Sequence, residues 1–229
     1  MFHVKQIYIM DFKIITIDGP SGVGKSTISR RIANRLEFFY VDTGAMFRCL
    51  AWSWDRQGCP ENTESLFRLG NQTDIILSNE NVLCNGTNVT LLIRSEHISK
   101  QASKISVFPS IREVLKKKQR ELVNKLGKTN EYKGAVLEGR DIGTVVFPNA
   151  EYKFFLDATP EVRAQRRMLQ LKIDGGDSNF EEILESLKKR DYRDQNRKVA
   201  PLRAAKDAII INTDNLSERE VLENLLSYF

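Results

Sequence analysis

The stretch KIITIDGPSGVGKS, residues 13–26, decides the fold of this chain. Its first six residues are a short apolar run rich in isoleucine, which predicts a buried strand. The next eight residues match the pattern Gly-x-x-x-x-Gly-Lys-Ser, and Ile28, Ile32 and Leu36 then recur at helical spacing. A strand, a glycine-rich loop and a helix in this order are the context that a phosphate-binding P-loop requires.

This loop predicts a binding site for the phosphates of a nucleoside triphosphate, which we expect to be MgATP. Glycines let the backbone wrap round the phosphates with its N–H groups pointing inward, and the helix N-terminus adds positive potential. Lys25 is expected to reach the β and γ phosphates and Ser26 to ligate Mg²⁺. A tight turn without a ligand would not require Lys and Ser at these offsets. The expected ATP-binding residues are Gly19, Pro20, Ser21, Gly22, Val23, Gly24, Lys25, Ser26 and Thr27.

The remaining apolar runs predict an α/β fold. Four short runs, at 38–41, 134–137, 153–156 and 208–211, are separated by helical patterns, as buried parallel strands are. Together with the first strand they predict a doubly wound, five-stranded parallel sheet.

One region departs from this alternation. Residues 75–77, 82–84 and 89–93 read as short strands, and Asn85-Gly86 is typical of a two-residue hairpin turn. We therefore expect a small antiparallel insert.

Composition sets broad limits. With 229 residues, of which 41% are hydrophobic, the chain can bury one sizeable core. The net charge of +5 fits small polyanionic substrates as well as nucleic acid. The three cysteines form no Cys-x-x-Cys pair, and the first ten residues are too short for a signal peptide or membrane span. We expect a soluble, cytoplasmic protein.

Other P-loop classes are less well supported. A guanine-specific switch needs Asp-x-x-Gly after a strand and Asn-Lys-x-Asp on a later loop. Residues 55–58 match the first pattern but follow Trp-Ser-Trp rather than a buried strand, and residues 124–127 lack the final Asp. The lysines at 116–118 could form a nucleic-acid patch, although a solvated helix face is the more common outcome of such a run. Kinases of similar fold acting on another acceptor, and a non-catalytic nucleotide- or RNA-binding module, stay open as alternatives.

Two sets of charged residues recur at helical spacing near the C-terminus. A phosphotransferase needs cations that neutralise both of its substrates, and each set would share one helix face, although solvated helices with internal ion pairs show the same spacing. Between them, residues 172–179 (KIDGGDSN) indicate an exposed, mobile tip, which suggests a lid. The sets are Arg163, Arg166 and Arg167, and Arg190, Asp194 and Arg197.

Four longer motifs point to one family. They are IDGPSG at 17–22, DTGAMFR at 42–48, EGRDIGTVVFP at 138–148 and RDYRD at 190–194. Together they resemble the bacterial cytidylate kinases, and the resemblance extends from Phe12 to the C-terminus. It implies the transfer of a phosphoryl group from ATP to CMP or dCMP, giving ADP with CDP or dCDP.

The resemblance also implies site residues. Arg48, Arg140 and Arg197 would grip the CMP phosphate. Arg190 and Asp194 would hold the ribose, and Thr43 is also expected to bind CMP. The expected base-reading residues are Ser103, Arg112 and Asp141. The lid arginines Arg163, Arg166 and Arg167 would bind ATP, with Arg166 against the adenine, and the expected catalytic residues are Lys25, Arg140, Arg166 and Arg197.

The implied base-reading residues suit cytosine chemically. A carboxylate at Asp141 accepts from the exocyclic N4 amine, whereas uracil presents O4 there, so CMP should be preferred to UMP. Two positions depart from the family. Phe47 replaces the usual Tyr, and Leu91-Leu92 stand where an acidic residue is common.

The expected organisation follows from these assignments. Residues 1–11 form an N-terminal extension, 12–70 and 103–229 form the core kinase domain with a helical lid within 163–197, and 71–102 form the insert that binds the nucleoside monophosphate. No side chain is needed as nucleophile, because a CMP phosphate oxygen attacks the γ phosphorus directly. We expect no nucleic-acid or membrane partner and a monomer.

Overall fold

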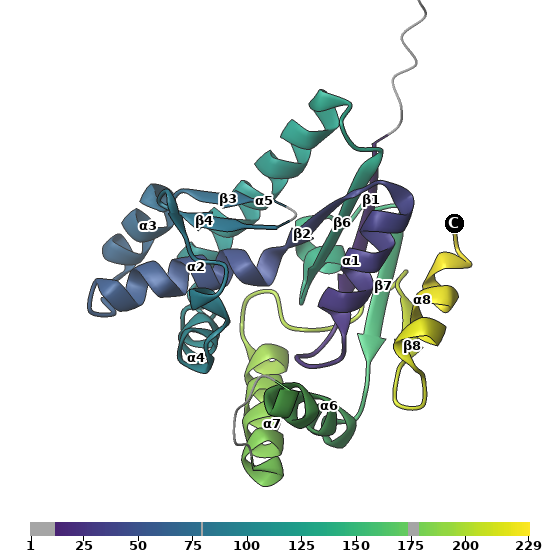
Figure 1. Ribbon diagram of the computed structural model, residues 1–229. Coiled ribbons are helices and arrows are strands. Elements are labelled where there is room, and N and C mark those ends of the chain that lie inside the picture. Colours follow the sequence, from purple (N-terminus) through teal and green to yellow (C-terminus); the bar gives the residue numbers. More distant parts are fainter. Residues whose placement is uncertain (1–11, 79, 174–178) are drawn as a thin grey trace, which may run out of the picture.

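The computed structural model describes residues 12–78, 80–173 and 179–229 (Figure 1). The expected N-terminal extension 1–11 lies outside the described residues, as does most of the expected lid tip, 174–178. Along the chain the strands are β1 Lys13–Asp18, β2 Phe39–Asp42, β3 Ile75–Leu77, β4 Val82–Cys84, β5 Thr87–Asn88, β6 Gly134–Gly139, β7 Tyr152–Asp157 and β8 Ile209–Asn212. The α-helices are α1 Lys25–Leu36, α2 Thr43–Arg56, α3 Thr63–Gln72, α4 Glu96–Ile105, α5 Pro109–Thr129, α6 Pro160–Ile173, α7 Phe180–Asn196 and α8 Glu218–Leu226.

A five-stranded parallel sheet forms the centre of the molecule. Its strand order is β2-β6-β1-β7-β8, and each neighbouring pair is parallel. Side chains of α1 and α8 share one apolar cluster with β1 and β7, while α5 contributes to a separate cluster with β2 and β6. Helices therefore cover both faces, and the predicted doubly wound α/β fold is confirmed; the strand ends differ from the predicted ones by one or two residues.

The antiparallel insert is present, with one correction. The strands order as β3-β4-β5, and Asn85 and Gly86 form the hairpin turn with φ of 49° and 76°, as expected of this dipeptide. The predicted strand at 89–93 is wrong. β4 begins at Val82, so residues past Val89 have no strand opposite them, and the chain turns into a short 3₁₀ helix, η1 Leu92–Arg94.

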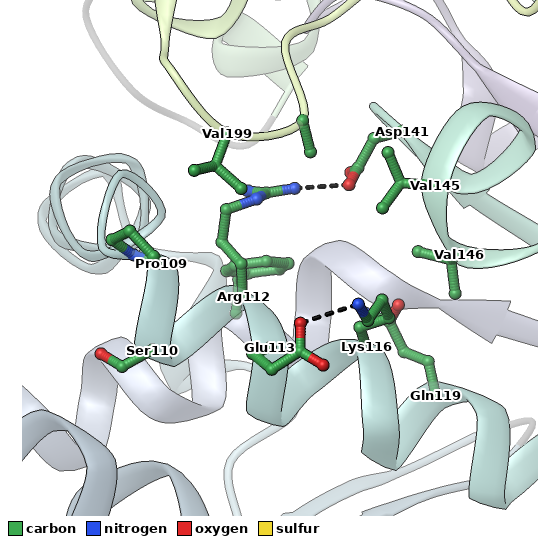
Figure 2. A pocket seen from close by; sticks show the side chains of 12 residues that line it. Pro109, Ser110, Arg112, Glu113, Lys116, Gln119, Asp141, Val145, Val146 and Val199 are labelled. Atoms are coloured by element: carbon green, nitrogen blue, oxygen red, sulfur yellow. Dashed lines mark hydrogen bonds and ion pairs between the residues drawn. The ribbon is translucent and has the colours of Figure 1, made fainter.

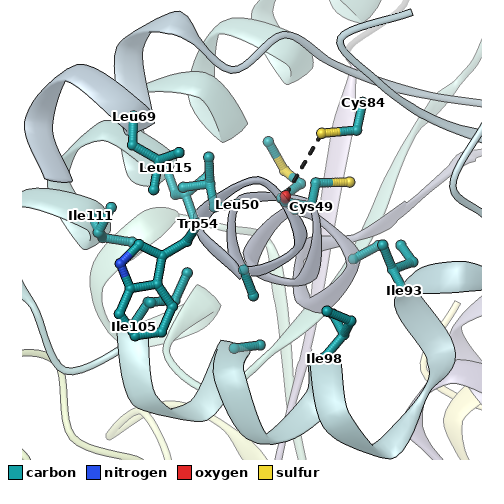
Figure 3. Packing of buried hydrophobic residues seen from close by; sticks show 14 of the residues in the cluster. Cys49, Leu50, Trp54, Leu69, Cys84, Ile93, Ile98, Ile105, Ile111 and Leu115 are labelled. Carbon is teal, nitrogen blue, oxygen red and sulfur yellow. Dashed lines mark hydrogen bonds between the residues drawn. The ribbon is translucent and has the colours of Figure 1, made fainter. Parts of the chain in front are cut away.

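The part of the chain that includes the insert has its own apolar core (Figure 3). Trp54 of α2 packs with Ile105 of α4 and Leu115 of α5, and all three are at most 2% exposed. The indole N–H of Trp54 donates to the carbonyl oxygen of Pro60 at 2.8 Å, so burial leaves no unpaired donor. This core is distinct from the two clusters that pack against the sheet.

Local signals place the last helices. Ser217 and Glu220 form the capping box expected before α8, with each side chain bonded to the other's backbone N–H. Thr159 precedes Pro160 at the start of α6, and its hydroxyl accepts from the N–H of Val162 at 3.4 Å. Among the described residues, no helix combines the length and apolar character needed to cross a membrane.

Candidate active site

The glycine-rich loop joins β1 to α1 at the carboxyl edge of the sheet. Gly24 is the N-cap of α1 and has a φ of 97°, in the left-handed region that favours glycine. No side chain caps this helix, so its first N–H groups can face an anion. Gly19 is needed for a different reason, because a Cβ at this position would lie 2.1 Å from the carbonyl oxygen of Leu156. The loop has the geometry of an anion cradle.

Lys25, the first residue of α1, is buried and turns back onto the loop. Its Nζ donates to the carbonyl oxygen of Pro20 at 2.6 Å. Burial lowers the pKa of this amine well below its usual value, and the nearby Arg140 lowers it further, while Glu138 opposes the shift. A polyanion bound in the loop would stabilise the charged amine.

The side chain of Glu138 lies near the glycine-rich loop, and the sequence analysis assigned it no functional role. Its carboxylate accepts the hydroxyl of Tyr40 and a hydrogen bond from the side chain of Ser26, while Thr43 donates to its backbone oxygen at 2.5 Å. Burial raises the pKa of Glu138, and the charge of Asp42 adds to the rise. The carboxylate therefore stands beside the predicted magnesium ligand Ser26. Its position at the carboxyl end of a buried strand was the available signal.

Asp18 is a second buried carboxylate that the sequence did not single out as functional. It accepts from the backbone N–H groups of Ile142 and Gly143 at 2.9 and 2.7 Å. Those residues begin a π-helical turn, η2 Ile142–Val146, which follows Asp141 directly. Burial raises the pKa of Asp18 to about 6. This side chain fixes the segment that carries Asp141.

A chain of ion pairs links α7 to the segment after β6. Arg140 Nε lies 3.1 Å from Asp194 Oδ2, and Arg197 Nη1 lies 3.8 Å from Asp194 Oδ1. Arg197 Nη2 is also 3.6 Å from Asp141 Oδ1. Burial opposes ionisation of Asp194, but the arginines, Arg140 foremost, lower its pKa below the usual range. Four of the predicted acceptor-site residues therefore come together.

Arg197 lies just beyond the helix on which it was predicted. α7 ends at Asn196, and Arg197 is its C-cap residue with an extended backbone. Its Nε donates to the carbonyl oxygen of Ala200 at 2.6 Å, which ties the following turn to the guanidinium. The expected i, i+4, i+7 face of one helix is thus wrong in its last member, although Arg197 still reaches Asp194.

Cations crowd this part of the site. Burial lowers the pKa of Arg190 to about 10, and Arg140 contributes to the shift. Burial likewise lowers the pKa of Arg197 to about 10, with help from Arg112. Arg48 is held by Asp42 at 2.8 Å. Guanidinium groups that lie this close to one another are stabilised when an anion binds between them.

Two of the three predicted base-reading residues, Arg112 and Asp141, line a cavity of about 390 Å³ (Figure 2). Arg112 Nη2 is 2.6 Å from Asp141 Oδ2, and both side chains are at least nine-tenths buried. Arg112 lies 5.4 Å from the centre of the Phe47 ring, which also lines the cavity. Ser103 is buried on α4, is not among the lining residues, and its Oγ has no hydrogen-bond partner in the described part of the chain.

The three predicted lid arginines point in different directions. Arg163 is buried and pairs with Asp191 at 2.6 Å. It also donates to the carbonyl oxygen of Ser21 at 3.0 Å, which holds the glycine-rich loop in place. Arg166 donates to the side chain and backbone of Thr213, at 2.9 and 2.5 Å.

Arg167 is half-buried and donates to Gln170 on its own helix at 3.0 Å. In the structure these three side chains do not converge on one ligand position.

Comparison with known proteins matches residues 15–229 to the family model described as cytidylate kinase. The cytidylate kinase of Caldanaerobacter subterraneus is 43% identical over 92% of this chain and 92% of its own length. That of Haemophilus ducreyi is 42% identical over 94% of this chain and 95% of its own. That of Syntrophotalea carbinolica is 44% identical over 93% of this chain and 90% of its own.

Proposed function

The chain belongs to the cytidylate kinase family and phosphorylates CMP at the expense of ATP; we propose that MgATP is the donor form, that dCMP is also an acceptor, and that the residues described above perform the transfer. One observation supports the assignment of residues most strongly. The buried Arg112–Asp141 pair, suited to cytosine, is linked through Arg197 and Asp194 to the cations that face the loop of Lys25.

The donor phosphates bind the loop between β1 and α1. Backbone N–H groups and the N-terminus of α1 face the phosphates, and Lys25 moves its Nζ from the carbonyl of Pro20 to the phosphate oxygens. Arg163 keeps the loop in place through Ser21. Arg166 and Arg167 would approach the donor when the lid, residues 163–197, closes over it.

The acceptor binds on the side of the sheet where the insert, residues 71–102, lies. Arg48, Arg140 and Arg197 grip its phosphate, exchanging their present carboxylate partners for phosphate oxygens. Arg190 and Asp194 hold the ribose. Asp141 accepts from the N4 amine of cytosine while Arg112 donates to O2 and N3. An oxygen of the CMP phosphate then attacks the γ phosphorus while the bond to the β–γ bridging oxygen breaks and ADP leaves, so the protein supplies alignment and charge stabilisation.

The residues beside the loop fit a magnesium ion. Ser26 supplies a hydroxyl and Glu138 a buried carboxylate bonded to it, and Mg²⁺ prefers oxygen ligands and keeps several waters. When bound there, Mg²⁺ would neutralise negative charge that develops on the phosphates during transfer. Tyr40 and Thr43 hold Glu138 in place through its carboxylate and its backbone oxygen.

The test is ADP release from ATP with CMP, dCMP, UMP, AMP or no acceptor, each with Mg²⁺ and with excess EDTA. We expect fast release with CMP and dCMP, slow release with UMP, and loss of all activity in EDTA. Fast release with AMP alone would contradict the assignment of Arg112 and Asp141. Acceptor-independent ATP binding without turnover, accompanied by salt-sensitive RNA binding, would instead support a binding module.

A further inference from the structure

Gln119 is a buried amide in the base pocket that no step above uses. It lies seven residues after Arg112 on α5, which places both on the same face of the helix, and it lines the same cavity as Arg112 and Asp141 (Figure 2). Only 2% of the residue is exposed, and its Oε1 has no hydrogen-bond partner in the described part of the chain. A buried acceptor without a donor destabilises the protein unless a ligand supplies one.

The cations that neighbour Gln119 on α5 each have another acceptor. Lys116, one turn earlier on α5, pairs with Glu113 at 2.7 Å. Arg120 donates to the carbonyl oxygens of Val146 and Val145 at 2.8 and 3.1 Å. None of the described residues donates to Gln119 Oε1, which lines the cavity, so a ligand in the cavity can supply the missing donor.

Cytosine carries such a donor. Its N4 amine has two hydrogens, and a single carboxylate at Asp141 accepts one of them. We propose that Gln119 is a second base-reading residue, whose amide oxygen accepts the other hydrogen of the N4 amine. This inference rests on the proposed function, because it assumes that the cavity holds the base of the acceptor nucleotide.

An amide at this position reads the base less strictly than a carboxylate would. Either side chain accepts from the N4 amine of cytosine, but the neutral amide oxygen repels O4 of uracil less than the negative charge of a carboxylate does. Gln119 therefore strengthens binding of CMP while Asp141 excludes UMP. A carboxylate at position 119 should make that exclusion stricter, and an apolar side chain of similar length should weaken CMP selectively.

The experiment measures kcat/KM for CMP and for UMP, together with the melting temperature, in the wild type, Gln119→Met, Gln119→Glu and the control Glu121→Gln. Glu121 lies on the same helix, is exposed and faces Lys117 at 3.8 Å, outside the cavity. We expect Gln119→Met to lower kcat/KM for CMP about 10-fold and to leave UMP within about 2-fold, the effect of one hydrogen bond.

The same measurement should show Gln119→Glu lowering UMP turnover at least about 10-fold while CMP stays within about 3-fold, with the control unchanged. An unchanged CMP to UMP ratio in both variants, with only the melting temperature lowered, would show that Gln119 is structural and would overturn the inference. A wild type without CMP-dependent ADP release would instead refute the proposed function, so the two failures are distinguishable.

Discussion

The phosphate end and the base end of the site are built in opposite ways. At the phosphate end, one continuous loop between β1 and α1 supplies backbone N–H groups and Lys25. At the base end, Arg112 comes from α5, Asp141 follows β6 and Phe47 belongs to α2, so the pocket forms only when distant segments pack together. A cradle for phosphate can be encoded in eight residues, whereas recognition of a base requires tertiary structure.

The two ends also differ in what their charges require. Cations dominate the phosphate end, where burial and neighbouring guanidinium groups lower the pKa of Arg190 and Arg197 to about 10. At the base end, Arg112 and Asp141 neutralise each other at 2.6 Å. The first end is therefore completed by an anion, and the second by a ligand that offers donors and acceptors in one plane.

The largest effect is expected at the phosphate end. Lys25→Met should lower kcat at least about 10³-fold, because it removes the ammonium that moves from the carbonyl oxygen of Pro20 to the transferring phosphate. Activity assays and a melting curve check this, with exposed Lys117→Met as the matched control. Near-normal turnover in Lys25→Met would mean that the loop is not the donor site.

A smaller effect is expected at the base end. Asp141→Ala should lower kcat/KM for CMP about 100-fold and bring the CMP to UMP ratio toward one, because it removes the acceptor for N4 and leaves Arg112 without its buried partner. Glu64→Ala, which breaks an exposed pair with Arg68, is the control and should change neither quantity. A preserved preference for CMP would remove Asp141 from the base-reading residues.

A third effect is expected at Asp18, the buried carboxylate that holds the segment after Asp141. Burial raises the pKa of Asp18 from its ordinary value of 3.8 to about 6 in the folded protein. The folded state thus binds more protons between these values, and the contribution of Asp18 to stability falls as pH rises through this window, by on the order of 2 kcal/mol. Urea unfolding of wild type and Asp18→Asn at pH 4 and pH 7 measures this. The stability difference between them should shift against the wild type at pH 7, and a shift of opposite sign would contradict the assignment.

The smallest effect is expected at Phe47, which lines the base cavity below Arg112. Phe47→Tyr restores the hydroxyl common in the family, and one added hydrogen bond should lower KM for CMP about 3-fold with kcat unchanged. Steady-state kinetics checks this. A change in kcat without a change in KM would place the hydroxyl near the reacting phosphate rather than near the bound base.

The sequence predicts the phosphate end of the site better than the base end. The loop, the five parallel strands and the Ser217 capping box are local patterns, and each was found where expected. The strand predicted at 89–93 failed because β4 begins at Val82 and leaves no strand opposite the residues past Val89, so Leu91 and Leu92 are 78% and 52% exposed.

The base-reading residues could be named only from the resemblance to a family, since nothing in their spacing brings α5 to the segment after β6. Glu138 and Gln119 were missed for the same reason. Their partners, or the lack of partners, depend on contacts between segments far apart in the chain.

The contact between Lys25 and the carbonyl oxygen of Pro20 bears on the speed of nucleotide exchange. The amine has an oxygen partner within its own loop, so donor binding replaces one oxygen ligand by others and product release restores the first. The glycines are ordered when the protein folds and need not be ordered again at each turnover. Little conformational entropy then changes at either step, which favours rapid departure of ADP as much as rapid arrival of ATP.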